Sequence, residues 1–157
     1  MPPDSADPFV VRIVPFQWDE AYIDLLCLRQ AVLRADLPRY TLDQLREEAH
    51  DIHVALYRSG SSQAIGGYLI RQIGGWLQMR QVAVDPAEQK QGLGRRLVRH
   101  FEAHARERGV TRLFIEARGS AVDFYLRLGY HPTGETFSNA ESTLENFRLE
   151  KHLSGLP

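Results

Sequence analysis

The sequence predicts an α/β protein. Apolar runs of strand length alternate with segments whose apolar residues recur at helical spacing, and turn-forming residues separate them. Two glycines one residue apart, Gly92 and Gly94, lie where the turn after one strand-like run meets an amphipathic helix. The 157 residues, 43% of them apolar, suffice for one hydrophobic core. Because the chain has no repeat or linker, we expect residues 9–157 to form a single domain after a disordered tail, residues 1–8.

The first third of the chain is expected to form a strand and two helices. Residues 9–15 alternate in polarity as a strand does. Residues 20–33 are predicted to be helical, with one inward face made of Ile23, Leu26, Cys27, Gln30 and Leu33. Cys27, the single cysteine, is expected to fill the core. Thr41 and Gln44 form a capping box, which predicts a second helix reaching about Ala49.

The rest of the chain is expected to alternate between strands and helices. We expect an antiparallel meander at residues 52–57, 64–72 and 76–84, and later strands at 110–117 and near 135–137 and 147–150. One helix is predicted from about Leu93 to Arg108, with Gly109 as its C-terminal stop. A further helix, capped by residues 120–123, is expected to end at Gly129.

The strand–turn–helix segment of residues 82–97 has the features of an anion site. The first amides of a helix lack intrahelical partners, the helix dipole is positive there, and glycine lets an anion approach the backbone. Arg95 and Arg96 follow Gly94, so the Gly-Lys-Ser/Thr of a Walker loop is absent. A dinucleotide fingerprint is a weaker alternative, because its third glycine is missing although Glu116 stands where a ribose-binding acid would be expected.

Two motifs in this region resemble those of the GNAT N-acetyltransferase family. Gln89-x-x-Gly92-x-Gly94 is similar to the family's acyl-CoA signature, (Gln/Arg)-x-x-Gly-x-(Gly/Ala). Residues 121–130, Ala-Val-Asp-Phe-Tyr-Leu-Arg-Leu-Gly-Tyr, look like its second hallmark motif. Both occur in the family's order and separation, so the resemblance is specific over about residues 76–131. Fainter similarity at residues 29–33, 117–118 and 134–137 suggests the ElaA-like branch.

The resemblance implies the fold and the cofactor. The fold would be the family's acyl-CoA N-acyltransferase fold, a central mixed sheet of six or seven strands, splayed between strands four and five and flanked by about four helices. The cofactor would be acetyl-CoA, with the main chain of residues 82–84 pairing with the pantetheine amides and the amides of residues 91–95 holding the diphosphate. The implied cofactor-binding residues are Val82, Ala83, Val84, Gln89, Lys90, Gln91, Gly92, Leu93, Gly94, Arg95 and Tyr125.

The implied reaction is acetyl transfer from acetyl-CoA to a primary amine by direct attack in a ternary complex. Tyr125 stands where the family keeps a tyrosine that donates a proton to the departing CoA sulfur. Some members use a glutamate base at about the position of Gln78, and glutamine cannot act as a base. We therefore place Glu116 with Tyr125 in the expected catalytic set, with His53, His131 or a water relay as alternative bases.

Composition narrows the expected partners. The formal net charge of −1 gives no field to attract nucleic acid, no apolar run is of membrane-spanning length, and residues 1–8 lack the parts of a signal peptide. We expect a cytoplasmic monomer or homodimer that binds neither nucleic acid nor membrane. His100 and His104 lie four residues apart without the other groups of a metal motif, so we expect a surface pair and no metal site.

The acceptor is expected to be a small molecule or a peptide that carries an amine. We expect it to lie against residues 36–40 and the closing loop, residues 138–144. Glu135, Glu141 and Glu145 would either attract a cation there or be ordinary solvated charges. A non-catalytic acyl-CoA-binding or regulatory module on the same fold is the alternative, because a fold does not guarantee its chemistry.

Overall fold

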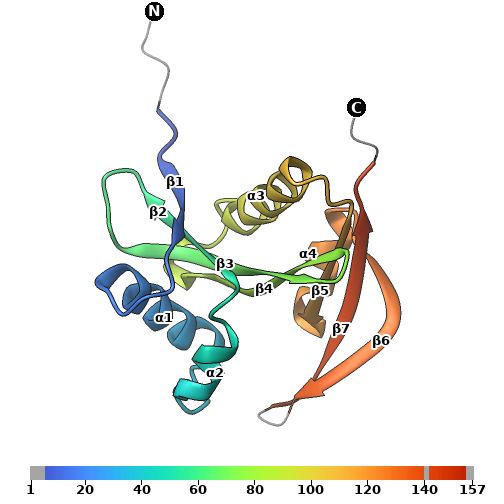
Figure 1. Ribbon diagram of the computed structural model, residues 1–157, viewed down its shortest axis with the longest axis horizontal. Coiled ribbons are helices and arrows are strands. Elements are labelled where there is room, and N and C mark those ends of the chain that lie inside the picture. The colour runs from blue at the N-terminus through green and yellow to red at the C-terminus, as the bar shows by residue number, and fades with distance from the viewer. Residues whose placement is uncertain (1–5, 140–141, 155–157) are drawn as a thin grey trace, which may run out of the picture. The chain divides into compact units, whose positions relative to one another are not determined.

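The computed structural model describes residues 6–139 and 142–154, and within these ranges it contains seven strands and four α-helices (Figure 1). The elements in chain order are β1 (Phe9–Val14), α1 (Glu20–Leu33), α2 (Leu42–Glu47), β2 (Ile52–Arg58), β3 (Ala64–Ile73), β4 (Trp76–Val84), α3 (Leu93–Glu107), β5 (Arg112–Arg118), α4 (Val122–Arg127), β6 (His131–Asn139) and β7 (Ser142–His152). Short 3-10 turns, η1 (Pro86–Glu88) and η2 (Gly119–Ala121), precede α3 and α4.

The seven strands form one mixed sheet in the order β1-β2-β3-β4-β5-β7-β6. β1 and β2 are antiparallel from the pair Phe9↔Arg58 to the pair Val14↔His53. β4 and β5 are parallel, and their register covers the four pairs from Trp76↔Arg112 to Met79↔Ile115. β7 pairs antiparallel with both β5 and β6. The predicted α/β class and mixed sheet are confirmed.

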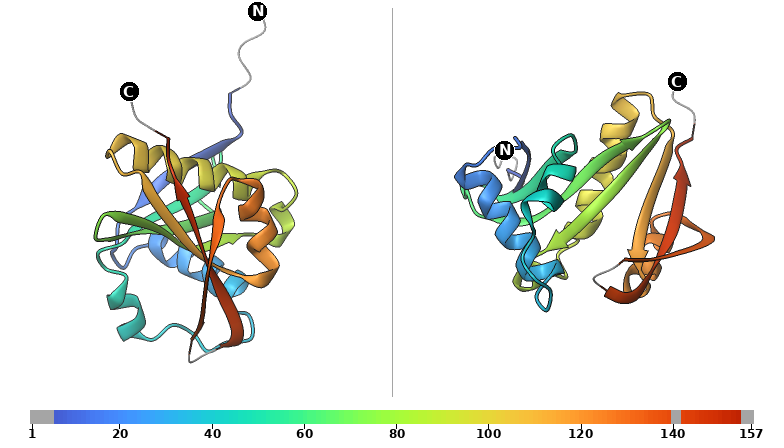
Figure 2. Two further views of the ribbon diagram at one scale, coloured as in Figure 1. Left: turned by 90° about the vertical axis from the view of Figure 1, so that its right-hand side faces the viewer. Right: turned by 60° about the horizontal axis from the view of Figure 1, so that its bottom comes forward.

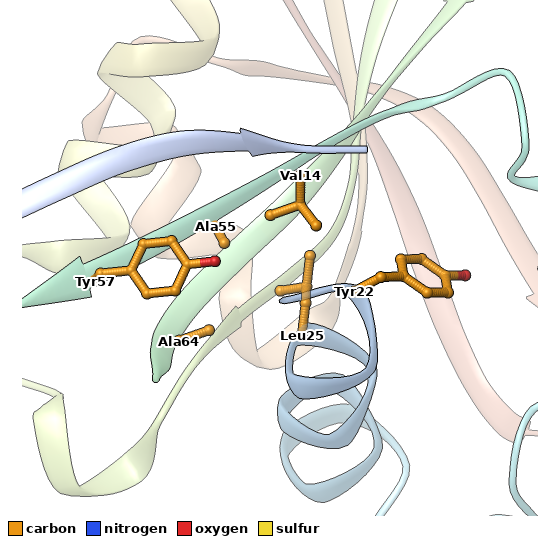
Figure 3. Close-up of a cluster of buried hydrophobic side chains, with 6 residues drawn as sticks. All are labelled: Val14, Tyr22, Leu25, Ala55, Tyr57 and Ala64. Atoms are coloured by element: carbon orange, nitrogen blue, oxygen red, sulfur yellow. The ribbon is translucent and has the colours of Figure 1, made fainter. Parts of the chain in front are cut away.

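The described residues fall into two compact units, the first made of residues 6–69 and 81–97 and the second of residues 70–80, 98–139 and 142–154. The N-terminal tail and the single domain proposed from the sequence stay predictions. In the first unit, α1 packs on strands through a cluster of buried side chains: Val14, Tyr22, Leu25, Ala55, Tyr57 and Ala64 (Figure 3). Close packing requires Gly67 in β3, because a Cβ there would lie 2.7 Å from the backbone oxygen of Val54 as well as 2.6 Å from Leu25 Cδ1.

The inward face of α1 differs from the predicted one. The buried residues of this helix are Tyr22, Leu25 and Arg29, whereas Ile23 is exposed and Cys27 is also exposed. Apolar side chains occur all around α1, so their spacing did not select a face. The expectation that Cys27 fills the core is therefore wrong. The capping box of Thr41 and Gln44 is confirmed, although α2 ends at Glu47.

The second unit contains β5, β7 and β6 side by side (Figure 2). Glu102 of α3 accepts hydrogen bonds from the Tyr130 hydroxyl at 3.0 Å and from Lys151 Nζ at 3.0 Å, which ties the end of α4 and β7 to the helix. His104 is buried, so the expected surface pair with His100 is wrong, because this side of α3 also packs inward.

Two element ends also differ from expectation. Helix α4 has Ala121 at its N-cap position with no side-chain cap, so the predicted cap at residues 120–123 is wrong, because η2 leads into the helix instead. The last two strands are longer than the short segments expected around residues 135–137 and 147–150. β7 pairs with both β5 and β6, and this pairing extends the two strands beyond what local composition favours.

Candidate active site

The turn between β4 and α3 has the backbone conformation expected of an anion cradle. Asp85 caps η1 by accepting a hydrogen bond from the Ala87 amide, and Asp85 N–H bonds Ile65 O at 2.8 Å. Lys90 and Gly92 then adopt left-handed conformations, with φ of 69° and 75°. The helical hydrogen bonds begin with Arg96 N–H to Gly92 O, and buried Leu93 anchors the first turn. The helix amides that precede Arg96 have no intrahelical partner.

The backbone at Gly92 is open to an approaching group. A Cβ built on Gly92 would meet no atom within 4 Å, so the backbone here borders open space. α3 is 15 residues long, so its dipole makes the N-terminal end attractive to negative charge. A left-handed glycine beside free helix amides is what a diphosphate needs for close approach. The turn at Gly92 therefore has the backbone features of a diphosphate site.

Charged side chains around the cradle are mostly engaged with neighbours. Arg96 forms a salt bridge with Asp7 at 2.6 Å, and its guanidinium group lies over the Phe9 ring. These two contacts engage the Arg96 side chain. Glu88 pairs with Arg58, whose hydrogen bond lowers the Glu88 pKa, and also accepts from Gln91 Nε2 at 2.9 Å. Arg95 is exposed and has no salt bridge within the described ranges. Arg95 is thus the arginine here that is free to meet a phosphate.

Strand β4 approaches the cradle through an irregular backbone. Gln81 has φ of 53°, a left-handed conformation that is uncommon for a residue other than glycine. The residues after it, Val82 to Val84, complete the strand, with Ala83 buried. The Gln81 side chain accepts a hydrogen bond from the Tyr40 hydroxyl at 2.9 Å. Gln81 was not among the site residues expected from the sequence, because side-chain chemistry does not reveal a left-handed glutamine inside a strand. Tyr40 was expected only as part of the acceptor region, residues 36–40, and not as a partner of Gln81.

The candidate catalytic residues lie in the second unit, whereas the cradle lies in the first. Tyr125 is 5% exposed and makes edge-to-face contacts with Phe124 and Tyr130 at centroid distances of 5.0 and 5.9 Å. Burial raises the pKa of Tyr125 to about 12, so its hydroxyl keeps its proton at neutral pH. Glu116 is exposed on β5, where it is paired in register with Arg148.

The alternative bases have different surroundings. His53 is buried, and its Nε2 lies 2.9 Å from the Glu48 carbonyl oxygen. Because a carbonyl only accepts, Nε2 carries the proton in the neutral ring and Nδ1 has a lone pair. Nδ1 has no hydrogen-bond partner among the described residues, and burial lowers the His53 pKa. His131 is exposed at the start of β6, and Gln78 is buried in β4.

No group of three or more potential metal ligands occurs among residues 6–139 and 142–154. In the same part of the chain, each helix is too short or too polar to span a membrane. The acceptor region expected from the sequence is described in part: residues 36–40 connect α1 to α2, and Glu135 and Glu145 are exposed, but Glu141 lies outside the described residues.

Solved structures share this fold, the acyl-CoA N-acyltransferase fold. The ribosomal-protein-S18-alanine N-acetyltransferase of Escherichia coli superposes with a TM-score of 0.73 at 18% identity, covering 94% of this chain and 97% of that one. A GNAT family acetyltransferase of Elizabethkingia anophelis, solved with acetyl-CoA bound, gives 0.70 at 15% identity over 94% and 99%. ElaA of Escherichia coli gives 0.69 at 15% identity over 92% and 99%.

The sequence profile described as the "Acetyltransferase (GNAT) family" matches residues 15–130, and the chain belongs to this family, whose cofactor is acetyl-CoA. The predicted family and fold are confirmed; the likeness to ElaA, at its low identity, extends to the fold alone. A curated relative is the [ribosomal protein bS18]-alanine N-acetyltransferase of Escherichia coli K12, 43% identical over 53 residues. That match covers 32% of this chain and 36% of the relative, about a third of its length.

Proposed function

We propose that this protein transfers an acetyl group from acetyl-CoA to a primary amine. The observation that carries the proposal is the open, left-handed Gly92 turn at the start of α3, within the span that matches the family. The amides of residues 91–95 bind the diphosphate, and the main chain of Val82, Ala83 and Val84 binds the pantetheine amides. When bound, acetyl-CoA supplies the thioester whose carbonyl carbon the amine attacks.

Tyr125 acts as the general acid in this proposal. As the new C–N bond forms and the C–S bond breaks, the departing sulfur gains negative charge, and the Tyr125 hydroxyl donates a proton to it. Its pKa of about 12 favours this role, because the hydroxyl is protonated across the working pH range. Glu116 accepts the proton that the amine loses. His53, His131 and a water relay are the alternatives, and pH–rate profiles of Glu116→Gln, His53→Gln and His131→Gln distinguish them.

The acceptor is a small molecule or peptide carrying a primary amine. The net charge of −1 and the exposed Glu135 and Glu145 favour a cationic acceptor over an anionic polymer. The curated relative is named for an alanine of a ribosomal protein, which supports including peptides. A panel of polyamines, amino acids, aminoglycosides and peptides, with thiol release as the readout, tests this class. Turnover on acidic acceptors alone would contradict it.

We further propose that the protein is cytoplasmic and is either a monomer or a homodimer. Light scattering on the purified chain measures its mass directly, and a larger assembly would contradict the second part. Fractionation of the host cell tests the first part. Neither property is needed for the chemistry proposed above.

The cradle is tested with two matched glycine variants. Gly92→Val places a side chain in the space proposed for the diphosphate, whereas Gly60→Val adds the same strain at another left-handed glycine with nothing within 4 Å. CoA at a hundredfold excess over its Kd should stabilise the wild type by about 2.7 kcal/mol. We expect Gly60→Val to retain this stabilisation and Gly92→Val to lose it. A protein stabilised by NAD but not by CoA would overturn the proposal.

The alternative function, a non-catalytic acyl-CoA-binding module, rests on Gln78. This residue stands where some family members have a glutamate base, and it is buried in β4. Under this alternative CoA would stabilise the protein, but no amine in the panel would release thiol from acetyl-CoA. The two measurements together therefore separate an enzyme from a binding module.

A further inference from the structure

Gln81 has a backbone conformation that its surroundings must maintain. Its φ of 53° interrupts the extended backbone of β4 immediately before Val82. A residue with a Cβ rarely adopts this region, and such residues persist where neighbouring contacts fix them, often beside functional sites. The segment Val82–Val84 has Gln81 at one end and Asp85, followed by the cradle, at the other. Gln81 therefore lies at the end of this segment that is remote from the diphosphate.

Tyr40 provides the contact that fixes Gln81. Its hydroxyl donates to Gln81 Oε1 at 2.9 Å, joining the α1–α2 connection to β4 across 41 positions of sequence. The Tyr40 ring is itself held by two guanidinium groups, Arg29 at 4.8 Å and Arg34 at 4.4 Å from its centroid. Arg34 Nη2 also donates to Pro38 O at 2.7 Å, within the connection that carries Tyr40.

The base of this arrangement is a buried ion pair. Arg29 is 0% exposed and forms a two-pronged pair with Glu48, with Nη1···Oε1 at 3.0 Å and Nη2···Oε2 at 2.7 Å. The planar geometry of this pair fixes the guanidinium under the Tyr40 ring. The contacts thus run without interruption from Glu48 through Arg29 and Tyr40 to Gln81, all within the first unit.

We infer that Tyr40 is a positioning residue for acetyl transfer, acting through Gln81. The inference rests on the proposed function, in which Val82–Val84 binds the pantetheine arm and the thioester lies at the Gln81 end of that segment. Loss of the Tyr40 hydroxyl frees Gln81 and misplaces the thioester, while the diphosphate contacts at Gly92 stay intact. The effect therefore falls on kcat more than on affinity for CoA.

The experiment compares Tyr40→Phe with Tyr57→Phe. Tyr57 is a buried tyrosine of the same unit whose hydroxyl has no hydrogen-bond partner among the described residues. Loss of one neutral hydrogen bond corresponds to roughly a threefold to tenfold change. We expect Tyr40→Phe to lower kcat by about this factor, with the KM for acetyl-CoA and the Kd for CoA within about twofold of wild type. Tyr57→Phe should leave all three unchanged.

A double-mutant cycle with Gln81→Leu adds a readout that loss of stability alone would not produce. If the two side chains act as one unit, the double variant should be no slower than either single variant. Gln81→Glu keeps an acceptor oxygen for the Tyr40 hydroxyl, so it should retain most of the kcat that Gln81→Leu loses. Unchanged kcat in Tyr40→Phe, or independent effects in the cycle, would overturn the inference. A wild type that transfers no acetyl group would overturn the proposed function and this inference with it.

Discussion

At the scale of single residues, Tyr125 combines burial with a reactive group. The aromatic neighbours Phe124 and Tyr130 fix its ring, and burial raises its pKa to about 12. We expect Tyr125→Phe to lower kcat by about 10²–10⁴-fold while leaving CoA affinity nearly intact, because a positioned proton donor is lost without a change of shape. Steady-state kinetics and CoA titration measure the two quantities.

The control for this variant is Tyr130→Phe. Tyr130 donates to Glu102, so its hydroxyl supports folding and not the reaction, and its loss should lower stability with little effect on kcat. The Tyr125 pKa also implies that deprotonation of this hydroxyl does not limit the rate below about pH 11. Turnover of Tyr125→Phe equal to that of the wild type would assign Tyr125 to packing.

The sequence indicated the glycine of the turn before α3 but not all of the turn's geometry. Gly92 was expected where an anion approaches the backbone closely, and it adopts the left-handed conformation that glycine tolerates. Lys90 and Gln81 adopt the same conformation without glycine's freedom, and tertiary contacts such as Tyr40 to Gln81 decide this. Arg96 pairs with Asp7, 89 positions away, which the sequence did not indicate. Such distant pairings leave no local signal.

At the scale of elements, the buried pair of Arg29 and Glu48 joins α1 to the end of α2. Glu48→Gln would leave the Arg29 charge buried without a counterion, which is expected to cost about 3–5 kcal/mol of unfolding free energy. Asp43→Asn provides the control on the same short helix, because Asp43 and Arg46 form a pair whose side chains are 91% and 74% exposed. That change should stay within about 0.5 kcal/mol. Urea denaturation measures both.

A Glu48→Gln variant as stable as Asp43→Asn would show that the pair contributes little. Replacing both partners, as in Arg29→Met with Glu48→Leu, removes the buried charge and should recover part of the loss. The same double variant removes the support under Tyr40, so it should stay slow in acetyl transfer even where stability returns. This double variant therefore separates the effect of the pair on stability from its effect on turnover.

Features of helices that depend on a strong local sequence pattern could be predicted, whereas features that depend on tertiary contacts could not. α3 begins at Leu93 as expected, because its apolar residues keep helical spacing, and the capping box of Thr41 and Gln44 forms. The buried face of α1 was missed, since it includes Arg29, a charged residue that becomes buried through Glu48. Spacing of apolar residues cannot reveal a buried ion pair.

At the scale of the whole molecule, strand order is the property least accessible to local patterns. The sequence indicates which segments form strands, but β7 lies between β5 and β6 in the sheet, and pairing distant in sequence decides this. The family resemblance supplied the mixed sheet, which the parallel β4–β5 register and the antiparallel β5–β7 register confirm. Long-range pairing carries no signal in composition or periodicity.

The stability of the whole chain should fall as the solution is acidified below about pH 6.5. Burial lowers the pKa values of His53, His100 and His104, so these rings stay neutral in the native state when the unfolded chain already binds protons. Their contribution is fully present above the unfolded pKa of about 6.5 and is lost as the pH falls toward the lowered native pKa values. Each ring contributes at most about 1.4 kcal/mol per pH unit, and partly exposed His100 contributes less.

His53 should account for a clear share of this loss. It is 1% exposed, and burial, together with the nearby Arg29 charge, lowers its pKa. The hydrogen bond to the Glu48 carbonyl and the charges of Glu48 and Asp51 oppose that effect. Urea denaturation of the wild type at pH 7.5, 6.5 and 5.5 gives the slope of unfolding free energy against pH. His53→Gln should flatten that slope, and His131→Gln, a change at an exposed position, should not. A wild type whose stability is constant or rises as the pH falls through this range would contradict the assignment, because buried neutral histidines can only lose stability on acidification.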